Sequence, residues 1–477
     1  MAPTPLMDYR GVASRSYSCA QVVEEALTRA KASEDLNAFV EIFYASARAQ
    51  AVRVDAQLAE GKTLPLAGMV VAIKDNLCYK GHTVTAGSKI LSGFESLFSA
   101  TAVERLINAG AVIIGRTNCD EFAMGSSSET SFYGPVKNPL DTTKVPGGSS
   151  GGSAAVVAAG LCHVALGSDT GGSIRQPAAF TGIVGMKPTY GRISRHGLIA
   201  YASSFDQIGP FAHSLEDAAL VTQIMAGSDD FDSTCSSRPV PALRAVATTE
   251  KKKLGYFRST MEHPGLDPEI KAGLLRLFDA LRSEGHTVDA LDFPYLDQLV
   301  PLYYIITTAE ASANLARFDG VRFGHRTAEP VDNLEDLMKG SRSEGFGIEV
   351  QRRILLGTFV LSSGYYDAYF GKAQKARRVI RDHALDLLET YDGLLSPTSP
   401  HTAFAIGRKE TDPTVMYLED VFTVHANITG FPALSLPGGL HSNGLPYGIQ
   451  ITTGPWEEEA LFALSATVQS ALKGITA

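Results

Sequence analysis

The sequence predicts an α/β protein. An apolar run at residues 70–73 is typical of a buried strand, residues 101–109 have the pattern of a helix, and the apolar run 111–115 predicts the next strand. Strands and helices that alternate in this order are typical of α/β folds, in which helices cover a sheet. A chain of 477 residues is long enough for roughly two or three domains, or for one large α/β domain.

Two helices are expected before the first strand. Ser18 and Gln21 have capping-box spacing at the start of an amphipathic stretch that continues to Ala30. A second helix is expected over residues 45–58. Residues 1–62 are therefore expected to form an N-terminal helical segment.

A glycine-rich region follows the first two strands. Residues 153–159 predict a helix and residues 164–167 predict the next strand. A further helix is expected just after Ser173, because Pro177 suits its first turn. Twelve of the 45 glycines lie between residues 141 and 200, separated by apolar runs, which indicates a site built from loops.

The rest of the chain is expected to continue one domain that spans residues 1–477. Residues 63–227 form its catalytic core in this interpretation, and the polar, proline-containing stretch 228–250 is linker-like. Residues 251–477 complete the sheet and add a helical substrate-binding part. Within that last segment the pattern is largely helical over residues 270–284 and 348–389.

Composition excludes several classes of protein. The net charge is −9, so the chain lacks the basic surface that binds nucleic-acid phosphates unaided. The five cysteines are odd in number and form no C-x-x-C pair, which favours free thiols and no zinc site. The N-terminus has no basic and apolar signal pattern, and the longest apolar stretch is shorter than the ~20 residues that cross a bilayer. No membrane contact is expected.

Two glycine-rich loops present serines, Ser149 and Ser173, and a lysine, Lys74, ends the apolar run at residues 70–73. Serine becomes a good nucleophile only when a base removes its proton. Burial of a lysine lowers its pKa and allows it to serve as that base. Glycine-rich backbone lets N–H groups converge on a developing oxyanion. The pattern therefore predicts nucleophilic catalysis by a serine with a lysine as its base.

Two other interpretations of the loops are weaker. Residues 147–151 match the G-x-S-x-G nucleophile elbow, but that motif needs a strand directly before the serine, and residues 138–146 contain two prolines and several turn residues. A phosphate-binding loop at Ser173 would need a Gly-Lys-Ser/Thr sequence to follow, and neither that sequence nor a nearby lysine follows Ser173. The histidine nearest to the loops, His163, lies in an apolar stretch and is expected to be a hydrogen-bonded core residue.

Six longer blocks carry a resemblance. They are residues 72–76 (AIKDN), 120–125 (DEFAMG), 167–177 (GSDTGGSIRQP), 185–194 (GMKPTYGRIS), 203–210 (SSFDQIGP) and 310–320 (EASANLARFDG). On these blocks the chain resembles the amidase-signature family, over essentially its whole length. Within the family, the last two blocks resemble the glutamine-hydrolysing subunits of tRNA-dependent amidotransferases.

The resemblance implies a fold and a catalytic set. The implied fold is a large mixed β-sheet flanked by helices on both faces. The implied triad is Lys74 as base, Ser149 as a relay with a cis peptide bond, and Ser173 as nucleophile. Ser173 would form an acyl-enzyme, with backbone N–H groups of Thr170, Gly171 and Gly172 around the oxyanion.

The resemblance also implies a substrate pocket. Glutamine is a zwitterion, so its pocket needs a cation and an anion. Arg353 would bind the α-carboxylate, Asp420 the α-ammonium, and Tyr304 would line the pocket. The neighbours of two of these residues, Arg352 and Tyr303, leave the register open. The backbone at Met124 and Gly125 would receive the substrate amide.

The partners follow from the same resemblance. The chain would release ammonia from glutamine for a heterotrimer with two other subunits, B and C, which transamidates Glu-tRNA(Gln) or Asp-tRNA(Asn). No metal or cofactor is expected on this chain; ATP and Mg would be used by one of the partners, which would also contact the tRNA. A bacterial cytoplasmic location is expected, although an organellar form with a trimmed leader would have the same sequence pattern. The alternatives are a free-standing amidase and a non-catalytic assembly subunit.

Overall fold

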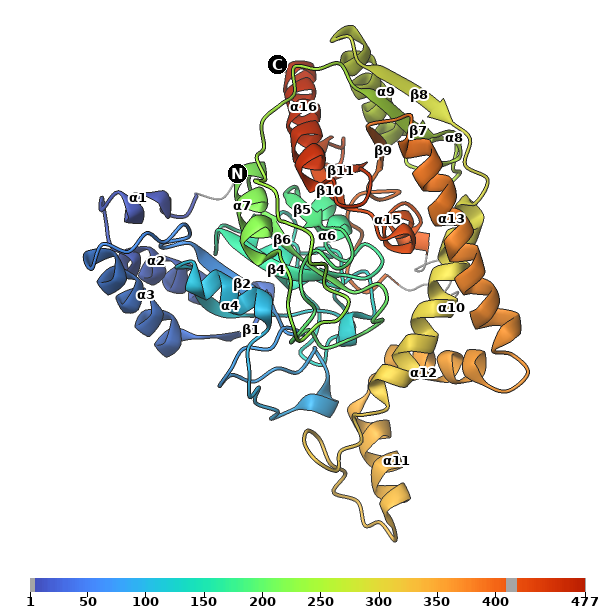
Figure 1. The fold of residues 1–477 in the computed structure, drawn as a ribbon. Coiled ribbons are helices and arrows are strands. Elements are labelled where there is room, and N and C mark those ends of the chain that lie inside the picture. Colours follow the sequence, from blue (N-terminus) through green and yellow to red (C-terminus); the bar gives the residue numbers. More distant parts are fainter. Residues whose placement is uncertain (1–4, 409–417, 477) are drawn as a thin grey trace.

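A mixed sheet of eleven strands runs through the part of the chain that the computed structural model describes, residues 5–408 and 418–476 (Figure 1). In spatial order the strands are β1 (Phe39–Ile42), β3 (Val112–Thr117), β2 (Val70–Lys74), β4 (Val164–Asp169), β6 (Gln207–Ala212), β5 (Val184–Lys187), β10 (Ala433–Leu440), β11 (Pro446–Thr452), β9 (Gly393–Pro397), β7 (Lys253–Phe257) and β8 (Thr287–Leu291).

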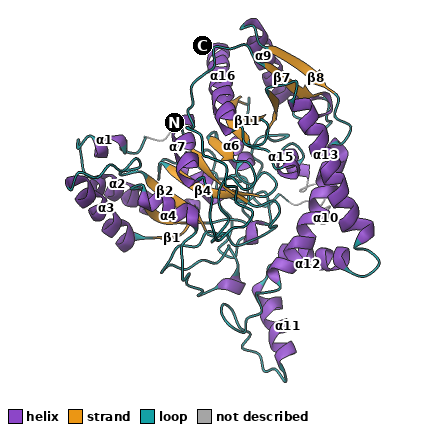
Figure 2. Ribbon diagram, in the orientation of Figure 1, coloured by secondary structure: helices purple, strands orange, loops and turns teal. Residues whose placement is uncertain are grey.

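Helices lie around this sheet (Figure 2). They are α1 (Arg10–Ala13), α2 (Cys19–Ala32), α3 (Tyr44–Ala59), α4 (Thr101–Asn108), α5 (Gly151–Ala158), α6 (Arg175–Thr181), α7 (Leu215–Met225), α8 (Arg258–Met261), α9 (Pro268–Ser283), α10 (Leu296–Leu315), α11 (Leu334–Gly345), α12 (Ile348–Leu361), α13 (Lys372–Leu388), α15 (Val424–Thr429) and α16 (Glu458–Thr476).

The pairing of the strands is mixed. Strand β2 pairs in parallel with β3 and β4, and β7 pairs in parallel with β8 and β9. The remaining pairs, from β4 through β6, β5, β10 and β11 to β9, and between β1 and β3, are antiparallel. The α/β fold and the mixed sheet expected from the sequence are both confirmed.

Strand β2 shows why the sheet is covered on both faces. Successive side chains of a strand point to opposite faces. Val71 and Ile73 join the apolar core that also holds α4, α7 and α16, whereas Val70 and Ala72 join the core that holds α2, α3 and α5. Lys74 continues the second series and so points toward α5.

Most elements predicted in the first half of the chain are confirmed within one or two residues. Helix α2 begins after Ser18, whose side chain accepts from the Gln21 N–H while the Gln21 side chain accepts from the Ser18 N–H, the complete capping box. Helix α6 contains Pro177 in its first turn. His163 is hydrogen-bonded at both ring nitrogens, with Val70 and Met7 as partners, as expected of a core residue.

The prediction that residues 348–389 are largely helical is confirmed, but the stretch is not one continuous helix. It is divided into α12 and α13, with a short π-helix at Asp367–Gly371 between them. The break follows Leu361 in a Ser-Ser-Gly sequence, and Gly364 adopts a φ of 85°, which favours glycine. The chain reverses there, so that α13 packs against α10 and α15.

Residues 228–250 contain no helix or strand. They nevertheless pack on the domain: the Asp229 carboxylate accepts from Thr101 and Ser194, and Asp232 accepts from the Arg195 N–H at 2.8 Å. Because β7, after this stretch, joins the same sheet as β2, the segment connects two halves of one sheet. The boundaries at 62, 227 and 250 stay predictions.

Candidate active site

Lys74 is the last residue of β2, and its ammonium nitrogen lies among three hydroxyls. The Nζ atom donates to Ser149 Oγ at 2.7 Å, to Ser150 Oγ at 3.0 Å and to Ser168 Oγ at 3.0 Å. The side chain is fully buried. The next residue, Asp75, lies on the opposite face of the sheet, where it pairs with Arg116. The nearest polar partners of Lys74 are therefore neutral.

Burial lowers the pKa of Lys74 to about 8, although the surrounding carboxyl groups of Asp120, Asp206 and Asp169 act in the opposite direction. A lowered pKa for Lys74 is what the sequence predicted. A lysine with this pKa is neutral in a useful fraction of molecules near neutral pH, and a neutral amine can accept a proton.

The two residues before Ser149, Gly147 and Gly148, occupy positions that only glycine can fill. The Gly148–Ser149 peptide bond is cis, as the resemblance implied. A Cβ atom at Gly148 would lie 2.2 Å from the Asp120 carboxylate, and one at Gly147 would lie 2.4 Å from Gln176 Oε1. The Gly148 N–H donates to that same Gln176 oxygen at 3.0 Å. These contacts fix the serine loop at the start of α5.

Ser173 lies in the turn between β4 and α6. Its carbonyl oxygen accepts from the Ser150 N–H at 3.3 Å, which ties the two serine loops together. Its hydroxyl makes no hydrogen bond with any group of the described chain, and the residue is 8% exposed. The structure thus brings Lys74 and Ser149 into contact, but it shows no bond between the Ser149 and Ser173 hydroxyls.

The loop before Ser173 offers unused donors. No acceptor in residues 5–408 and 418–476 bonds to the backbone N–H groups of Thr170, Gly171, Gly172 or Ser173. Gly172 has a φ of 141°, a conformation that L side chains rarely adopt. Converging N–H groups of this kind can bind an oxyanion.

Arg353 of α12 is the buried member of its arginine pair. Its Nε atom donates to Glu349 Oε1 at 2.8 Å and its Nη1 atom donates to the Tyr201 hydroxyl at 2.9 Å. The Arg352 side chain is 41% exposed and also pairs with Glu349. Of the two arginines left open by the sequence, Arg353 is the one directed into the protein.

Asp420 is a buried carboxyl group near Arg353. It is the last residue of the short helix Leu418–Asp420, which comes directly after the undescribed segment 409–417. Burial raises the pKa of Asp420 to about 8, against the opposing effect of Arg353. Within the described chain its carboxylate accepts no hydrogen bond, although the residue is only 9% exposed. A ligand ammonium would supply the missing partner.

Both tyrosines of α10 contact the site. Tyr304 lies under Arg353, whose guanidinium carbon is 5.2 Å from the ring centroid. Tyr303 is buried beside the loop before Ser173, because a Cβ at Gly171 would lie 2.6 Å from the Tyr303 hydroxyl. The two rings meet edge to face at 5.1 Å. The sequence left open whether Tyr303 or Tyr304 lines the pocket. In the structure Tyr304 contacts Arg353, and Tyr303 contacts the loop before Ser173.

The segment Met124–Gly125 is tied to the serine loop through Asp120. The Asp120 N–H donates to the Ser149 carbonyl at 3.2 Å, and the Asp120 carboxylate accepts from the Ser128 N–H at 2.8 Å. A Cβ at Gly125 would lie 2.4 Å from the Asp120 carboxyl carbon. Met124 itself is buried.

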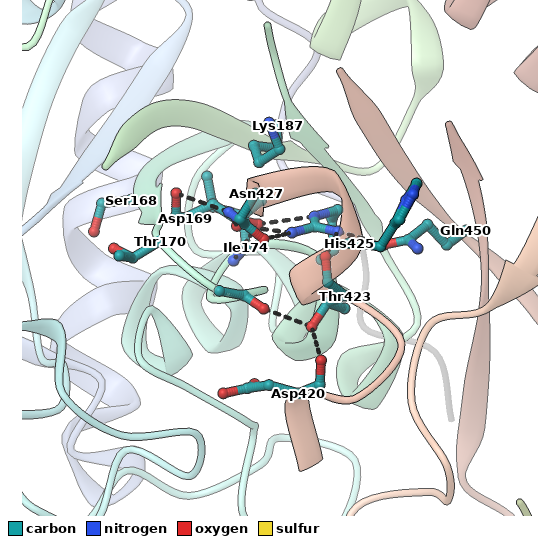
Figure 3. A network of polar contacts seen from close by, with 12 residues as sticks. Ser168, Asp169, Thr170, Ile174, Lys187, Asp420, Thr423, His425, Asn427 and Gln450 are labelled. Atoms are coloured by element: carbon teal, nitrogen blue, oxygen red, sulfur yellow. Dashed lines mark hydrogen bonds and ion pairs between the residues drawn. The ribbon is translucent and has the colours of Figure 1, made fainter. Parts of the chain in front are cut away.

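Several residues at the site were missed by sequence reasoning. Ser150 and Ser168 contact Lys74. Both lie in the glycine-rich motifs that contain Ser149 and Ser173, so the sequence could have indicated them. Tyr201 and Thr423 lie far away in the sequence and carry no local signal. Figure 3 shows Thr423 between Asp420 and the loop that leads to Ser173.

No group of three or more His, Cys, Asp or Glu side chains suited to a metal ion occurs among the described residues. Within the same residues, no helix is long and apolar enough to cross a membrane.

The comparisons with known proteins agree with this geometry. A family model described as Amidase matches residues 21–462. The chain is 49% identical over 456 residues to the A subunit of glutamyl-tRNA(Gln) amidotransferase from Synechococcus sp. (strain CC9311), covering 95% of this chain and 93% of that protein. It is 49% identical over 464 residues to the protein of the same name from Methylococcus capsulatus, covering 97% and 95%.

A solved structure is also similar. The crystal structure of the A subunit of glutamyl-tRNA(Gln) amidotransferase from Thermotoga maritima matches with a TM-score of 0.78 and 38% sequence identity, covering 95% of this chain and 91% of that chain.

Proposed function

This chain belongs to the amidase family, and on that premise we propose that it hydrolyses glutamine to glutamate and ammonia through an acyl-enzyme on Ser173. The observation that carries the choice of substrate is the buried pair Arg353 and Asp420 beside the Ser173 loop. Arg353 already pairs with Glu349, but the Asp420 carboxyl group accepts no hydrogen bond within the described residues, so an apolar or aryl amide would leave that buried group without a polar partner. A free amino acid supplies a carboxylate for Arg353 and an ammonium for Asp420.

The chemistry begins with proton transfer. Neutral Lys74 accepts the Ser149 hydroxyl proton, Ser149 accepts the Ser173 proton, and Ser173 Oγ attacks the side-chain amide carbon. The N–H groups of residues 170–173 bind the oxyanion of the tetrahedral intermediate. This step requires the Ser149 and Ser173 hydroxyls to bond when substrate is present. Catalytic hydrogen bonds often tighten only in the substrate complex.

The return of the proton completes the cycle. The proton passes back through Ser149 to the amide nitrogen, the C–N bond breaks, and ammonia leaves. Water then attacks the γ-glutamyl ester with the same proton relay, which releases glutamate and restores Ser173. Met124 and Gly125 border the position of the leaving nitrogen.

The ammonia has a destination in this proposal. The named relatives are components of an amidotransferase for glutamyl-tRNA(Gln). We propose that this chain works with two further subunits, B and C, in a heterotrimer that transamidates Glu-tRNA(Gln) or Asp-tRNA(Asn). ATP, Mg and most of the tRNA contact belong to one of these partners in this proposal. A chain with a net charge of −9 is poorly suited to bind tRNA phosphates unaided. We expect the complex to work in the cytoplasm, where aminoacyl-tRNA is used.

One assay tests the function. The chain is purified alone and with its co-expressed partners, and ammonia release is measured from glutamine, asparagine and an aryl amide. Hydrolysis of glutamine, increased in the complex, supports the proposal. Asparagine reacts more slowly because its amide is one methylene short of Ser173. High activity of the isolated chain on aryl amides with none on glutamine would identify a free-standing amidase, and inactivity of every preparation would identify a non-catalytic assembly role.

A further inference from the structure

The hydroxyl of Thr423 joins the two halves of the candidate site. Thr423 is fully buried between the Asp420 helix and α15. Its Oγ1 atom donates to the Gly171 carbonyl at 2.6 Å and lies 3.1 Å from the Asp420 carbonyl. A hydroxyl carries a single proton, so the shorter bond to Gly171 takes it. The Asp420 carbonyl is already satisfied by the Thr423 N–H at 3.0 Å.

The Ser173 loop packs directly on this threonine. A Cβ at Gly172 would lie 2.2 Å from Thr423 Oγ1. No side chain other than hydrogen fits between them, so the loop backbone and the threonine are in immediate contact. The position of Thr423 therefore sets where the free N–H groups of residues 170–173 lie.

Arg175 holds Thr423 through the main-chain carbonyl of the threonine. Its Nη1 atom donates to the Thr423 carbonyl at 2.9 Å, and its Nη2 atom pairs with Asp169 Oδ1 at 2.9 Å. Arg175 and Asp169 are both fully buried. Burial alone would raise the pKa of Asp169, but the adjacent Arg175 guanidinium lowers it to about 2. The pair stays charged and anchors the threonine backbone to the end of β4.

We propose that Thr423 is a positioning residue that keeps the oxyanion-binding N–H groups of residues 170–173 in register with the Asp420 carboxylate. This inference rests on the proposed function of the site. The hydrogen bond from Thr423 to the Gly171 carbonyl then has two effects. It accelerates the reaction, and it favours substrates that carry a free ammonium group. Loss of the bond lets the Asp420–Thr423 turn shift relative to the loop, while the ion pair behind it remains.

The test compares Thr423→Val, which removes the hydroxyl, with Thr423→Ser, which keeps it. Thr429→Val is the matched control, because Thr429 is equally buried but its hydroxyl bonds within its own helix, to the His425 carbonyl at 2.9 Å. The substrates are glutamine, glutaramate, which lacks only the ammonium, and butyramide, which lacks both charges. Each enzyme is assayed for kcat and KM in the full complex.

Thr423→Val is expected to affect kcat and KM differently across the three substrates. Thr423→Val lowers kcat on all three substrates by roughly 10- to 100-fold, because misplaced oxyanion donors lose part of their effect. It raises KM for glutamine only, since glutaramate and butyramide have no ammonium to place. Thr423→Ser and Thr429→Val stay within about threefold of the wild type. Wild-type constants for Thr423→Val, or an equal loss in the serine variant, would overturn the inference.

The design separates this inference from the proposed function. If the wild type hydrolyses butyramide but not glutamine, the proposed function fails, while kcat on butyramide still compares the threonine variants. If Thr423→Val does not fold, as judged by thermal unfolding, Thr423→Ala replaces it, because alanine leaves more room beside Gly172. Failure of both variants to fold would show a purely structural threonine and would also overturn the inference.

Discussion

The Nζ atom of Lys74 lies 2.7 Å from the Oγ atom of Ser149, and both side chains are fully buried. A charged lysine in such a place lacks a carboxylate in contact, which is why its pKa falls to about 8. The contact therefore pairs a hydroxyl with an amine that can be neutral. This is the arrangement that a proton relay needs, and most of the predictions below depend on it.

The first prediction concerns pH. Because only neutral Lys74 accepts a proton, kcat on butyramide should fall about tenfold for each pH unit below the pKa of Lys74. Butyramide carries no charge, so ionisation of Asp420 does not enter its binding. The pH profile of kcat in the purified complex is the measurement. A rate that is constant from pH 6 to pH 9 would contradict the role of Lys74 as base.

A second prediction concerns the same lysine by substitution. Lys74→Ala should lose roughly 10²–10⁴ in kcat or more, because the relay acts as a unit. Lys74→Arg should be equally inactive, since a guanidinium keeps its proton at any working pH. Steady-state ammonia release measures both. An active arginine variant would mean that Lys74 acts only as a structural cation.

The third prediction uses the neighbouring arginines as a matched pair. Arg353→Ala should weaken kcat/KM for glutamine by at least about 30-fold and change that for butyramide little, because loss of a partner from a buried charge pair costs ~2–5 kcal/mol. Arg352→Ala should leave both substrates near wild type, since Arg352 is exposed. Equal losses for glutamine and butyramide in Arg353→Ala would favour an amidase without a zwitterion pocket.

The fourth prediction is a proton released on binding. Asp420 has a pKa of about 8 in the empty site, so it is mostly protonated at pH 7, and binding of the glutamine ammonium should ionise it. Calorimetric titration of Ser173→Ala with glutamine, in two buffers of different ionisation enthalpy, should show release of close to one proton. Asp420→Asn should abolish the buffer dependence. Buffer-independent heats in the parent variant would contradict the assignment of Asp420.

The fifth prediction concerns stability and Glu121. This buried carboxyl group accepts from the Gly347 N–H at the start of α12, the helix that carries Arg353. Burial raises its pKa to about 7, despite hydrogen bonds from Ser88 and Gly347 that act in the opposite direction. A raised pKa in the folded state stabilises the protein fully below the unfolded pKa near 4.5, and this stabilisation is lost as pH rises through about 7.

Glu121→Gln removes that titration and keeps an acceptor oxygen for Gly347. The wild type should therefore lose unfolding free energy between pH 5 and pH 8 relative to the variant, by about 3 kcal/mol. Chemical denaturation at each pH measures the difference. Parallel pH profiles for the two proteins would show that Glu121 does not titrate in this range.

Local pattern was sufficient for much of the fold. The capping box at Ser18 and the apolar run of β2 depend on neighbours in the sequence, and both were predicted correctly. The order of the central strands was not, because β10 pairs with β5, whose residues lie more than 200 positions earlier in the chain, as in the pairing of Ala433 with Lys187. The break after Leu361 has a local signal in the Ser-Ser-Gly sequence at residues 362–364, but the broad helical pattern on both sides did not locate it.

Some residues of the candidate site could be predicted from local sequence motifs, and others could not. Lys74, Ser149 and Ser173 stand in short glycine-rich or apolar motifs that state their chemistry locally. Arg353 and Asp420 came only from a family resemblance, since a lone arginine or aspartate has no signature. Thr423 was invisible to sequence reasoning, because its importance arises from a contact with Gly171 across 252 positions of the chain.

The most direct test of the account is mass spectrometry of the complex quenched during turnover of glutamine. The account predicts a γ-glutamyl ester on the peptide that contains Ser173 in the wild type, and none in Ser173→Ala. Ser153→Ala is the control, because that buried serine bonds the Leu166 carbonyl at 2.8 Å and the Thr117 hydroxyl at 2.7 Å, and within the described residues it makes no hydrogen bond to Lys74 or to residues 170–173; it should keep the adduct. An adduct on Ser149 or another residue, or turnover of glutamine by Ser173→Ala, would contradict the central claim.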